Sequence, residues 1–230
     1  MDHTQLMEAL RATAEELTDA QKEHVSKGVC WTPNGNREYT IIRDESFEGQ
    51  EIHGIRHFGI EYRNCVFRNC YFSDNQYEYL ITMENCRFEN TVFEESWRDV
   101  QLNERNCIYV RCRFSGLALQ SFQEQSTVSS QSFEDCVFEK VRIAADITFQ
   151  PNQITRCRFV DCDLYMNCVN RCECRDTSFE SVTFKCALLS NRFERMSFER
   201  CGLSPELGCA HGNSCVECER DGEAFVIEDF

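Results

Sequence analysis

The sequence has few residues that bend a chain, and its charge is mostly of one sign. Its 230 residues include only three prolines and ten glycines, against 18 phenylalanines and 17 cysteines. Lys and Arg number 24 and Asp and Glu number 39, which gives a formal net charge of −15. Binding to nucleic acid requires a basic face, and so does binding to an anionic membrane. The charge balance therefore argues against direct binding to either.

Several familiar signatures are also missing. No apolar run approaches the roughly 20 residues of a membrane-spanning helix, and the segment MDHTQLMEALRATAEE is amphipathic and acidic, unlike a signal peptide. An odd number of cysteines without a secretion signal is typical of a reducing compartment, so we expect a cytoplasmic protein. The sequence contains no G-x-S-x-G, H-E-x-x-H, P-loop or G-x-G-x-x-G motif. We therefore expect a protein that is not an enzyme.

A five-residue pattern fills most of the chain. In NCVFRNCYF, Cys65 and Cys70 stand two residues before Phe67 and Phe72, which defines a small–x–large–x–x unit. Such units come in pairs that recur about every 20 residues. The first large residues of the pairs are Phe47, Phe67, Phe88, Tyr109, Phe133, Phe159, Phe179 and Phe198. The second are Ile52, Phe72, Phe93, Phe114, Phe138, Leu164, Phe184 and Leu203.

Strand geometry explains this pattern. Residues two apart point to the same face of an extended segment, so the small and the large residue of each unit both face inward. The residue between them faces solvent, and the other two turn a corner. Four such sides make one turn, and stacked turns lie about 4.8 Å apart. Because the period fits neither an α-helix nor a β-sandwich, the sequence predicts an all-β solenoid of about eight turns over residues 47–206.

Four runs, NCVFRNCYF, NCRFENTVF, DCVFEKVRI and RCRFVDCDLY, resemble the repeats of pentapeptide-repeat proteins. The resemblance implies a right-handed parallel quadrilateral β-helix. In character it is nearest to the topoisomerase-interacting quinolone-resistance type. It therefore implies a non-catalytic protein whose partner is a type II topoisomerase, DNA gyrase or topoisomerase IV, and which binds that enzyme as a mimic of DNA.

Two segments precede the repeats. Residues 3–22, within an N-terminal segment 1–27, predict an amphipathic helix with a capping box formed by Asp2 and Gln5. Its apolar stripe contains Leu6, Met7, Leu10, Ala14 and Leu17. We interpret this helix as a lid, because an open β-helix end exposes unpaired strand edges; a partner-binding helix is the alternative.

The segment 28–46 links the helix to the repeats. Pro33, Asn34 and Gly35 are a turn signal between two apolar stretches, so a hairpin leading into the rod is predicted. Trp31 lies just before the turn. We expect it to be an aromatic residue that caps the rod rather than a platform for a ligand.

Two turns are longer than the others. The stretches 119–132 and 144–156 carry about four and about six extra residues, and insertions in a solenoid become loops on one face. The resemblance implies that two projecting loops act on the target, whereas tolerated surface loops are the alternative. Candidate partner-binding residues here are Gln123, Glu124, Gln150 and Asn152. An alternative function follows, that of a scaffold or effector domain binding an unrelated protein through these loops.

The cysteines fall into two classes. Nine occupy the small inward position, where they act as small apolar side chains: Cys65, Cys70, Cys86, Cys107, Cys112, Cys136, Cys157, Cys162 and Cys201. The acidic tail 207–230, which we expect to be irregular, contains a different cluster. Its Cys209, His211, Cys215 and Cys218 could hold a structural zinc ion, since thiolates and imidazole are zinc ligands. The alternative is that cysteine is simply abundant in this chain.

Acidic residues follow many of the large inward residues. The pattern predicts one column of carboxylates on the rod, formed by Glu48, Glu89, Glu134, Glu180 and Glu199. A second column contains Glu94 and Glu139. A rod with regularly spaced carboxylates can occupy the DNA channel of a protein, guided by opposite charge. These residues are therefore the candidate partner-binding surface, and an ordinary solvated surface is the alternative.

Overall fold

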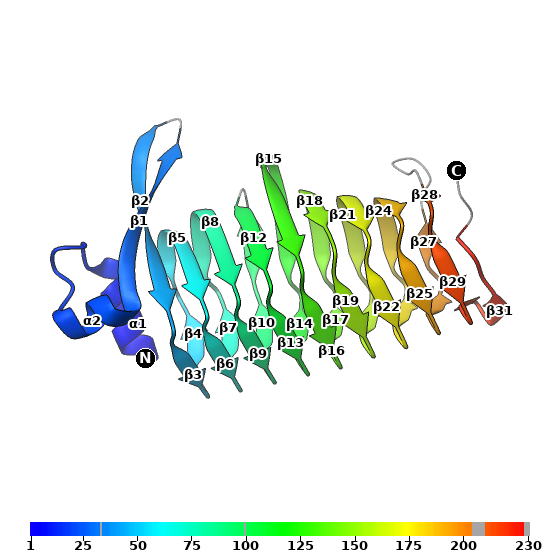
Figure 1. Ribbon diagram of the computed structural model, residues 1–230, viewed down its shortest axis with the longest axis horizontal. Helices are drawn as coiled ribbons and strands as arrows, with labels where there is room; N and C mark the ends of the chain where they lie inside the picture. Colours follow the sequence, from blue (N-terminus) through cyan, green and yellow to red (C-terminus); the bar gives the residue numbers. More distant parts are fainter. Residues whose placement is uncertain (33, 99, 204–209, 228–230) are drawn as a thin grey trace.

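A computed structural model describes residues 1–32, 34–98, 100–203 and 210–227, with side chains for all of these except 96, 98, 121–125 and 203. The chain forms a rod of stacked strands with two short helices at its N-terminal end (Figure 1). This β-solenoid confirms the predicted fold class. Neither helix, α1 (His3–Arg11) or α2 (Asp19–His24), has the length or the apolar character to cross a membrane.

Three sheets form the walls of the rod, and strands of successive turns pair in parallel. Sheet B consists of β3 (Ser46–Glu48), β6 (Val66–Arg68), β9 (Arg87–Glu89), β13 (Ile108–Val110), β16 (Ser132–Glu134), β19 (Gln153–Thr155), β22 (Glu173–Arg175), β25 (Arg192–Glu194) and β29 (Ser214–Val216). Sheet C consists of β4 (Glu51–His53), β7 (Tyr71–Ser73), β10 (Val92–Glu94), β14 (Arg113–Ser115), β17 (Val137–Glu139), β20 (Arg158–Val160), β23 (Ser178–Glu180), β26 (Ser197–Glu199), β30 (Glu219–Arg220) and β31 (Glu223–Ala224).

Sheet A contains the longer strands. Its members are β1 (Val25–Thr32), β2 (Gly35–Arg43), β5 (Arg56–Arg63), β8 (Gln76–Glu84), β11 (Ser96–Arg98), β12 (Gln101–Arg105), β15 (Ala118–Ser129), β18 (Arg142–Phe149), β21 (Asp163–Asn170), β24 (Thr183–Leu189), β27 (Gly202–Leu203) and β28 (Ala210–His211). The pairing of β5, β15, β18 and β21 shifts register partway along each strand. Sheets B and C each form one side of the rod, and sheet A forms the remaining two.

Asparagine and aspartate occupy about half of the non-glycine corners at positive φ, and arginine, serine, lysine and glutamate occupy the others. Asn64, Asn85 and Asn106 occupy equivalent corners with φ of 53°, 53° and 55°. Asn and Asp adopt this left-handed conformation more readily than other non-glycine residues. The Asn106 amide donates to Asn85 at 3.1 Å, and Asn85 donates to Asn64 at 3.2 Å. The corners therefore need few glycines, in agreement with the composition.

Aromatic side chains stack along the interior. In sheet B the ring of Phe88 lies 4.8 Å from those of Phe67 and Tyr109, nearly parallel to both. In sheet C the ring of Phe93 lies 5.0 Å from Phe72 and 4.9 Å from Phe114. The separations match the strand spacing of about 4.8 Å, because each ring stands above the ring of the preceding turn.

The predicted columns are wrong from the sixth turn onward. Phe159 stacks on Phe138 of sheet C at 4.3 Å, whereas Ile154 takes the place above Phe133 in sheet B. The interval from Phe133 to Phe159 thus contains one turn plus one further side. The side Gln153–Thr155 has no aromatic residue at its inward position, so the pattern of large aromatic residues does not mark it. Phe179 and Phe198 follow in sheet C, and Leu164, Phe184 and Leu203 belong to sheet A.

Neither of the two expected loops is a loop. Residues 144–156 contain the end of β18 and the whole of β19, which pairs in register with β16 and β22. The extra residues of 119–132 lie within the twelve-residue strand β15, whose register shifts between Ser121 and Ser126. In Figure 1, β15 extends beyond its neighbours. The extra residues of 144–156 therefore form a regular side of the rod that the prediction did not count. Those of 119–132 lengthen strand β15.

The N-terminal helices lie at the first turn. The expected single helix over 3–22 is interrupted, since α1 ends at Arg11 and α2 begins anew after its N-cap Thr18. The capping box of Asp2 and Gln5 is present. Leu6 and Leu10 are buried in the same cluster as Phe47, so α1 covers the open end of the core. Ala14 is exposed, in contrast to its expected place in the apolar stripe.

The hairpin β1–β2 forms as predicted, with antiparallel pairing from Val25 and Ile42 to Thr32 and Gly35. It extends away from the rod (Figure 1). The expectation that Trp31 caps the rod is wrong, because this side chain is 74% exposed. Strand β2 pairs with β5 over Thr40 to Arg43, so the first part of β2, at the end of the hairpin, has no strand of the rod paired beside it.

The C-terminal segment continues the solenoid. Strands β28, β29 and β30 pair in parallel with β24, β25 and β26, so the rod does not end at residue 206 and residues 210–220 form a further turn. The expectation of an irregular tail is wrong for these residues. Strand β31 then folds back antiparallel to β30, and the ring of Phe225 lies 5.5 Å from Phe198. This short hairpin covers the end of the sheet C aromatic column.

Candidate functional site

The candidate acidic residues lie on two neighbouring sides of the rod. Glu48, Glu89 and Glu134 stand in one outward column of sheet B. Glu180 and Glu199 do not join them, contrary to the prediction. Because of the shifted register, they continue the sheet C column instead, which contains Glu94, Glu139, Glu180 and Glu199.

Sheet C is the more acidic of the two sides. Its outward positions carry six carboxylates, Glu51, Glu94, Glu139, Glu180, Glu199 and Glu219, and two guanidinium groups, Arg113 and Arg158, an excess of four negative charges. The outward positions of sheet B carry five carboxylates, Glu48, Glu89, Glu134, Glu173 and Glu194, and four guanidinium groups, Arg68, Arg87, Arg175 and Arg192, an excess of one. Negative charge therefore gathers on sheet C, although sheet B has almost as many carboxylates.

Arginines from neighbouring turns partly neutralise both columns. In sheet C, Glu180 accepts from Arg158 at 2.9 Å and from Arg200 at 2.6 Å, and these bonds, led by that of Arg158, lower the pKa of Glu180. Glu94 instead accepts a hydrogen bond from the Tyr71 hydroxyl at 2.5 Å. Such exposed ion pairs contribute little stability, about 0–1 kcal/mol each. Their main effect is to set which carboxylates keep a net negative charge.

A line of alternating charge separates the two acidic sides. Asp135, Arg156, Asp176 and Arg195 occupy successive corners between sheets B and C, each at positive φ. Arg156 Nε donates to Asp135 at 2.7 Å, and Arg195 bonds Asp176 in the same manner. The hydrogen bond from Arg156 lowers the pKa of Asp135. These four corner residues carry no excess charge, so the carboxylates of sheet C form an acidic surface separate from those of sheet B.

The four candidates from the expected loops do not form a common surface. Asn152 is buried: its amide donates to the Val128 carbonyl at 3.1 Å, and its Oδ1 accepts from the Gln131 backbone N–H at 2.7 Å. It is a structural ladder residue rather than a partner contact. Gln150 is half-buried and accepts from the Asn170 amide at 2.9 Å. The backbone of Gln123 and Glu124 belongs to β15, and their side chains lie outside the described residues.

All nine cysteines predicted to face inward are buried. Each forms part of the wall between two turns; the Cys86 thiol, for example, lies 3.4 Å from the carbonyl oxygens of Tyr62 and Glu84. Burial raises the pKa of many of these thiols, including that of Cys162. A protonated, inaccessible thiol is a poor nucleophile. The inward cysteines therefore serve packing.

Thiol accessibility provides a test of this packing. Thirteen of the sixteen described cysteines are buried, and Cys30, Cys168 and Cys215 are half-buried. We expect the denatured chain to titrate with close to 17 thiols without added reductant, since the sequence has 17 cysteines and the described ones form no disulfide. In the native protein most thiols should react slowly with an aromatic disulfide reagent. Rapid reaction of all thiols in the native state would contradict the buried columns.

The expected zinc ligands are distributed over several sides of the last turn. His211 is exposed in β28, Cys215 is half-buried in β29, and Cys218 is buried next to β30. No group of three potential metal ligands occurs in the part of the chain that the structure describes. Cys209 lies outside the described residues. The zinc site accordingly stays a prediction that depends on Cys209.

Two inward carboxyls were missed by the sequence analysis. Glu95 occupies a small inward position and is 3% exposed; its carboxylate accepts from the Asn75 amide at 2.7 Å. The carboxyl of Glu104, a half-buried residue of β12, lines an apolar space inside the rod. Burial raises the pKa of each to about 7. The sequence contained a signal for Glu95. It stands two residues before Trp97, at the position where the repeat has a small inward residue.

Comparison with known proteins gives distant similarity. No family model and no curated protein matches the sequence. A trypsin-treated variant of QnrB1, a plasmid-mediated fluoroquinolone resistance protein, has a TM-score of 0.42 and 16% identity over 78% of this chain and 91% of that chain. For full-length QnrB1 the TM-score is 0.37, with 15% identity over 79% and 93%. At these values the similarity carries no argument about function.

The fold is assigned from the strand register instead. Five-residue sides, parallel ladders and inward columns of cysteine and phenylalanine are all present in the described residues. The chain fits a pentapeptide-repeat β-helix. Most of its inward positions are occupied by apolar side chains, and most of its charged groups lie on the outside. A binding surface for another molecule would therefore lie on the outer sides of the rod.

Proposed function

We propose that this protein is a non-catalytic, cytoplasmic interaction module. In this proposal the acidic side of sheet C binds the DNA-contacting surface of a DNA-processing enzyme. The supporting observation is the column of Glu94, Glu139, Glu180 and Glu199, which stands in register along a straight sheet. Carboxylates separated by one or two turns, about 5–10 Å, present negative charge to a basic channel along its length. A type II topoisomerase, either DNA gyrase or topoisomerase IV, is the specific target proposed.

The test compares two variants with the same change in charge. The sheet C variant replaces Glu94, Glu139, Glu180 and Glu199 by Gln. The sheet B variant replaces Glu48, Glu89, Glu134 and Glu194 by Gln. Affinity for purified gyrase and topoisomerase IV is measured over a range of salt concentrations, with and without competing duplex DNA. Circular dichroism and thermal unfolding establish that each variant is folded.

We expect the sheet C variant to weaken binding tenfold or more, about 1.4 kcal/mol, and the sheet B variant to bind nearly as the wild type does. Binding should weaken with salt, because exposed charges are screened, and duplex DNA should compete. Equal loss in both variants would show that net charge alone drives binding. If the wild type binds neither enzyme at micromolar concentration and low salt, gyrase and topoisomerase IV are excluded as its partners.

The alternative is a scaffold that binds an unrelated protein, and the extended strand β15 is the feature that favours it. The turn from Tyr109 to Phe133 spans 24 residues, whereas that from Phe88 to Tyr109 spans 21. Deleting residues 122–124 would restore the shorter length. The scaffold hypothesis predicts that this deletion abolishes partner binding and that DNA does not compete. The acidic-surface proposal predicts the opposite result for both measurements.

A further inference from the structure

The outer edge of strand β1 is unpaired at the N-terminal end of the rod. Sheet A begins at β1, and in the described residues β2 is its one paired neighbour. Along the strand order of each sheet, the inner strands pair with a strand on both sides, whereas the first and last strands pair on one side. A free edge presents a row of backbone N–H and C=O groups to which another strand can add.

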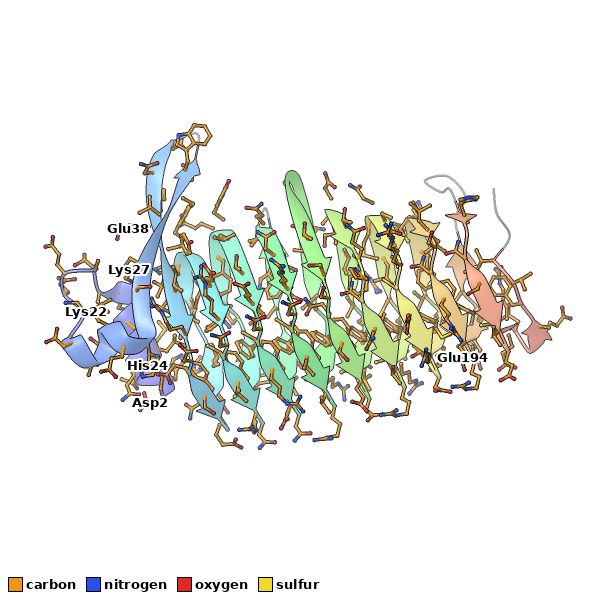
Figure 2. The ribbon with its side chains drawn as sticks, viewed as in Figure 1. Asp2, Lys22, His24, Lys27, Glu38 and Glu194 are labelled. Carbon is orange, nitrogen blue, oxygen red and sulfur yellow. The ribbon has the colours of Figure 1, made fainter. Side chains whose placement is uncertain are left out.

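Helix α1 covers the base of this hairpin but not its end. Lys27 Nζ donates to the carbonyls of Ala9 and Leu10 at 2.9 and 3.3 Å, and Val25 packs against Ala9 and Leu17. Figure 2 shows Lys27 below the tip of the hairpin, on the part that adjoins the helices. Beyond Lys27, the next residues on the same face are Val29 and Trp31, which are 62% and 74% exposed.

The exposed segment lacks the usual protection of an edge strand. Natural edges are shielded by lysine, proline, bulges or inward charges. Residues 28–32, GVCWT, contain no Asp, Glu, Lys or Arg, and proline follows at position 33. In a chain with a net charge of −15, this uncharged segment is a place where two copies can approach with little repulsion.

We propose that β1 pairs antiparallel with β1 of a second copy of this chain, about a two-fold axis at Cys30. The spacing of the apolar residues favours a second copy as the partner. Val29 and Trp31 flank Cys30 symmetrically, so each Val29 lies opposite the Trp31 of the other copy. Aromatic and β-branched residues form favourable cross-strand pairs, and a two-fold axis produces the pair twice. The two rods then join at their N-terminal ends through one continuous sheet A.

Sedimentation over a range of protein concentrations tests the dimer. Trp31→Glu places a charge at the centre of the proposed contact, and it should raise the dimer dissociation constant roughly 30-fold or more, as the loss of a tryptophan hot spot does. Val226→Glu is the matched control, because Val226 is 61% exposed at the opposite end of the rod. This control should dimerise as the wild type does. Far-UV circular dichroism checks the fold of both variants.

Cysteine cross-linking tests the position of the axis independently of any folding defect. Diamide takes one hydrogen from each of two thiols and becomes a hydrazine, while a bond forms between the two sulfur atoms. Cross-strand partners have Cβ atoms about 4.5–5.5 Å apart, close to disulfide geometry, so the wild type should give a covalent dimer. Cys30→Ser should abolish it.

The proposal is overturned if the wild type stays monomeric at hundreds of micromolar, which would leave the edge for a different protein. It is equally overturned if Trp31→Glu dimerises like the wild type, or if Cys30→Ser still cross-links. A concentration-dependent dimer that is lost in Trp31→Glu, kept in Val226→Glu and linked through Cys30 supports it.

Discussion

Replacing Phe88 by Ala is expected to lower the free energy of unfolding by about 3–5 kcal/mol, the usual cost of truncating a buried phenylalanine. Its side chain is fully buried, and its ring stacks between Phe67 and Tyr109 at 4.8 Å on each side. It also meets the edge of Phe93 at 5.4 Å. The lost ring therefore leaves a gap in the sheet B column next to Phe93 of sheet C, and neighbouring turns cannot close it without breaking their ladder.

Arg87→Ala is the matched control one residue earlier. Arg87 points outward, with 42% of its side chain exposed, and pairs with Glu89. We expect a loss of about 0.5 kcal/mol, as for other exposed ion pairs. Urea unfolding of the two variants and the wild type measures the difference. Similar losses for both variants would contradict the assignment of inward and outward positions.

Stability is expected to fall as pH rises, because of Glu95 and Glu104. Burial raises the pKa of both carboxyls to about 7, while an unfolded Glu titrates near 4.3. Between these values the folded state holds protons that the unfolded state has released. Stability therefore decreases from about pH 4.3 and the loss is complete above about pH 7, at roughly 4 kcal/mol for each group.

Neutral variants should remove this dependence. Glu95→Gln retains a partner for Asn75, and Glu104→Gln retains one for Tyr109, whose hydroxyl bonds Glu104. Each variant should be more stable than the wild type at pH 8 and close to it at pH 5. Burial lowers the pKa of His57 and gives the opposite trend, so the difference between variant and wild type is the quantity to measure. Parallel curves at all pH values would refute the assignment.

Denaturant titrations at several pH values supply these free energies. Glu134→Gln is the control, because it removes a carboxylate on the outer face of β16. This control should retain the pH slope of the wild type. If it abolishes the slope as Glu95→Gln does, surface charge rather than the buried carboxyls governs the dependence.

The inward and outward alternation could be predicted because it depends on local geometry. Cys86 and Phe88 stand two residues apart in an extended segment, so they face the same side whatever the rest of the chain does. Both are buried, and Arg87 between them is half-exposed. The same reasoning explains the capping box at Asp2 and Gln5, whose partners are three residues apart.

The assignment of residues to columns could not be obtained in that way. Which side stacks on which is decided by hydrogen bonds between turns, about 20 residues apart in sequence, and Gln153–Thr155 carries no large aromatic residue to mark its side. Because the prediction did not count this side, it placed Phe159, Glu180 and Glu199 in the column of sheet B. The strand register places all three in sheet C. The set of carboxylates that share the sheet C surface could therefore be identified only from the strand register.

The charge of the candidate surface and the place of Trp31 were likewise decided by tertiary structure. Composition determined that the chain is acidic, but Arg158 and Arg200 reach Glu180 from turns more than 19 residues away in either direction. The sequence also determined a turn after Trp31. The exposure of Trp31 follows instead from the pairing of β2 with β5, which begins at Thr40 and leaves the end of the hairpin without a paired strand of the rod. Local patterns establish what each residue does within its own strand, and contacts between turns establish which residues share a surface.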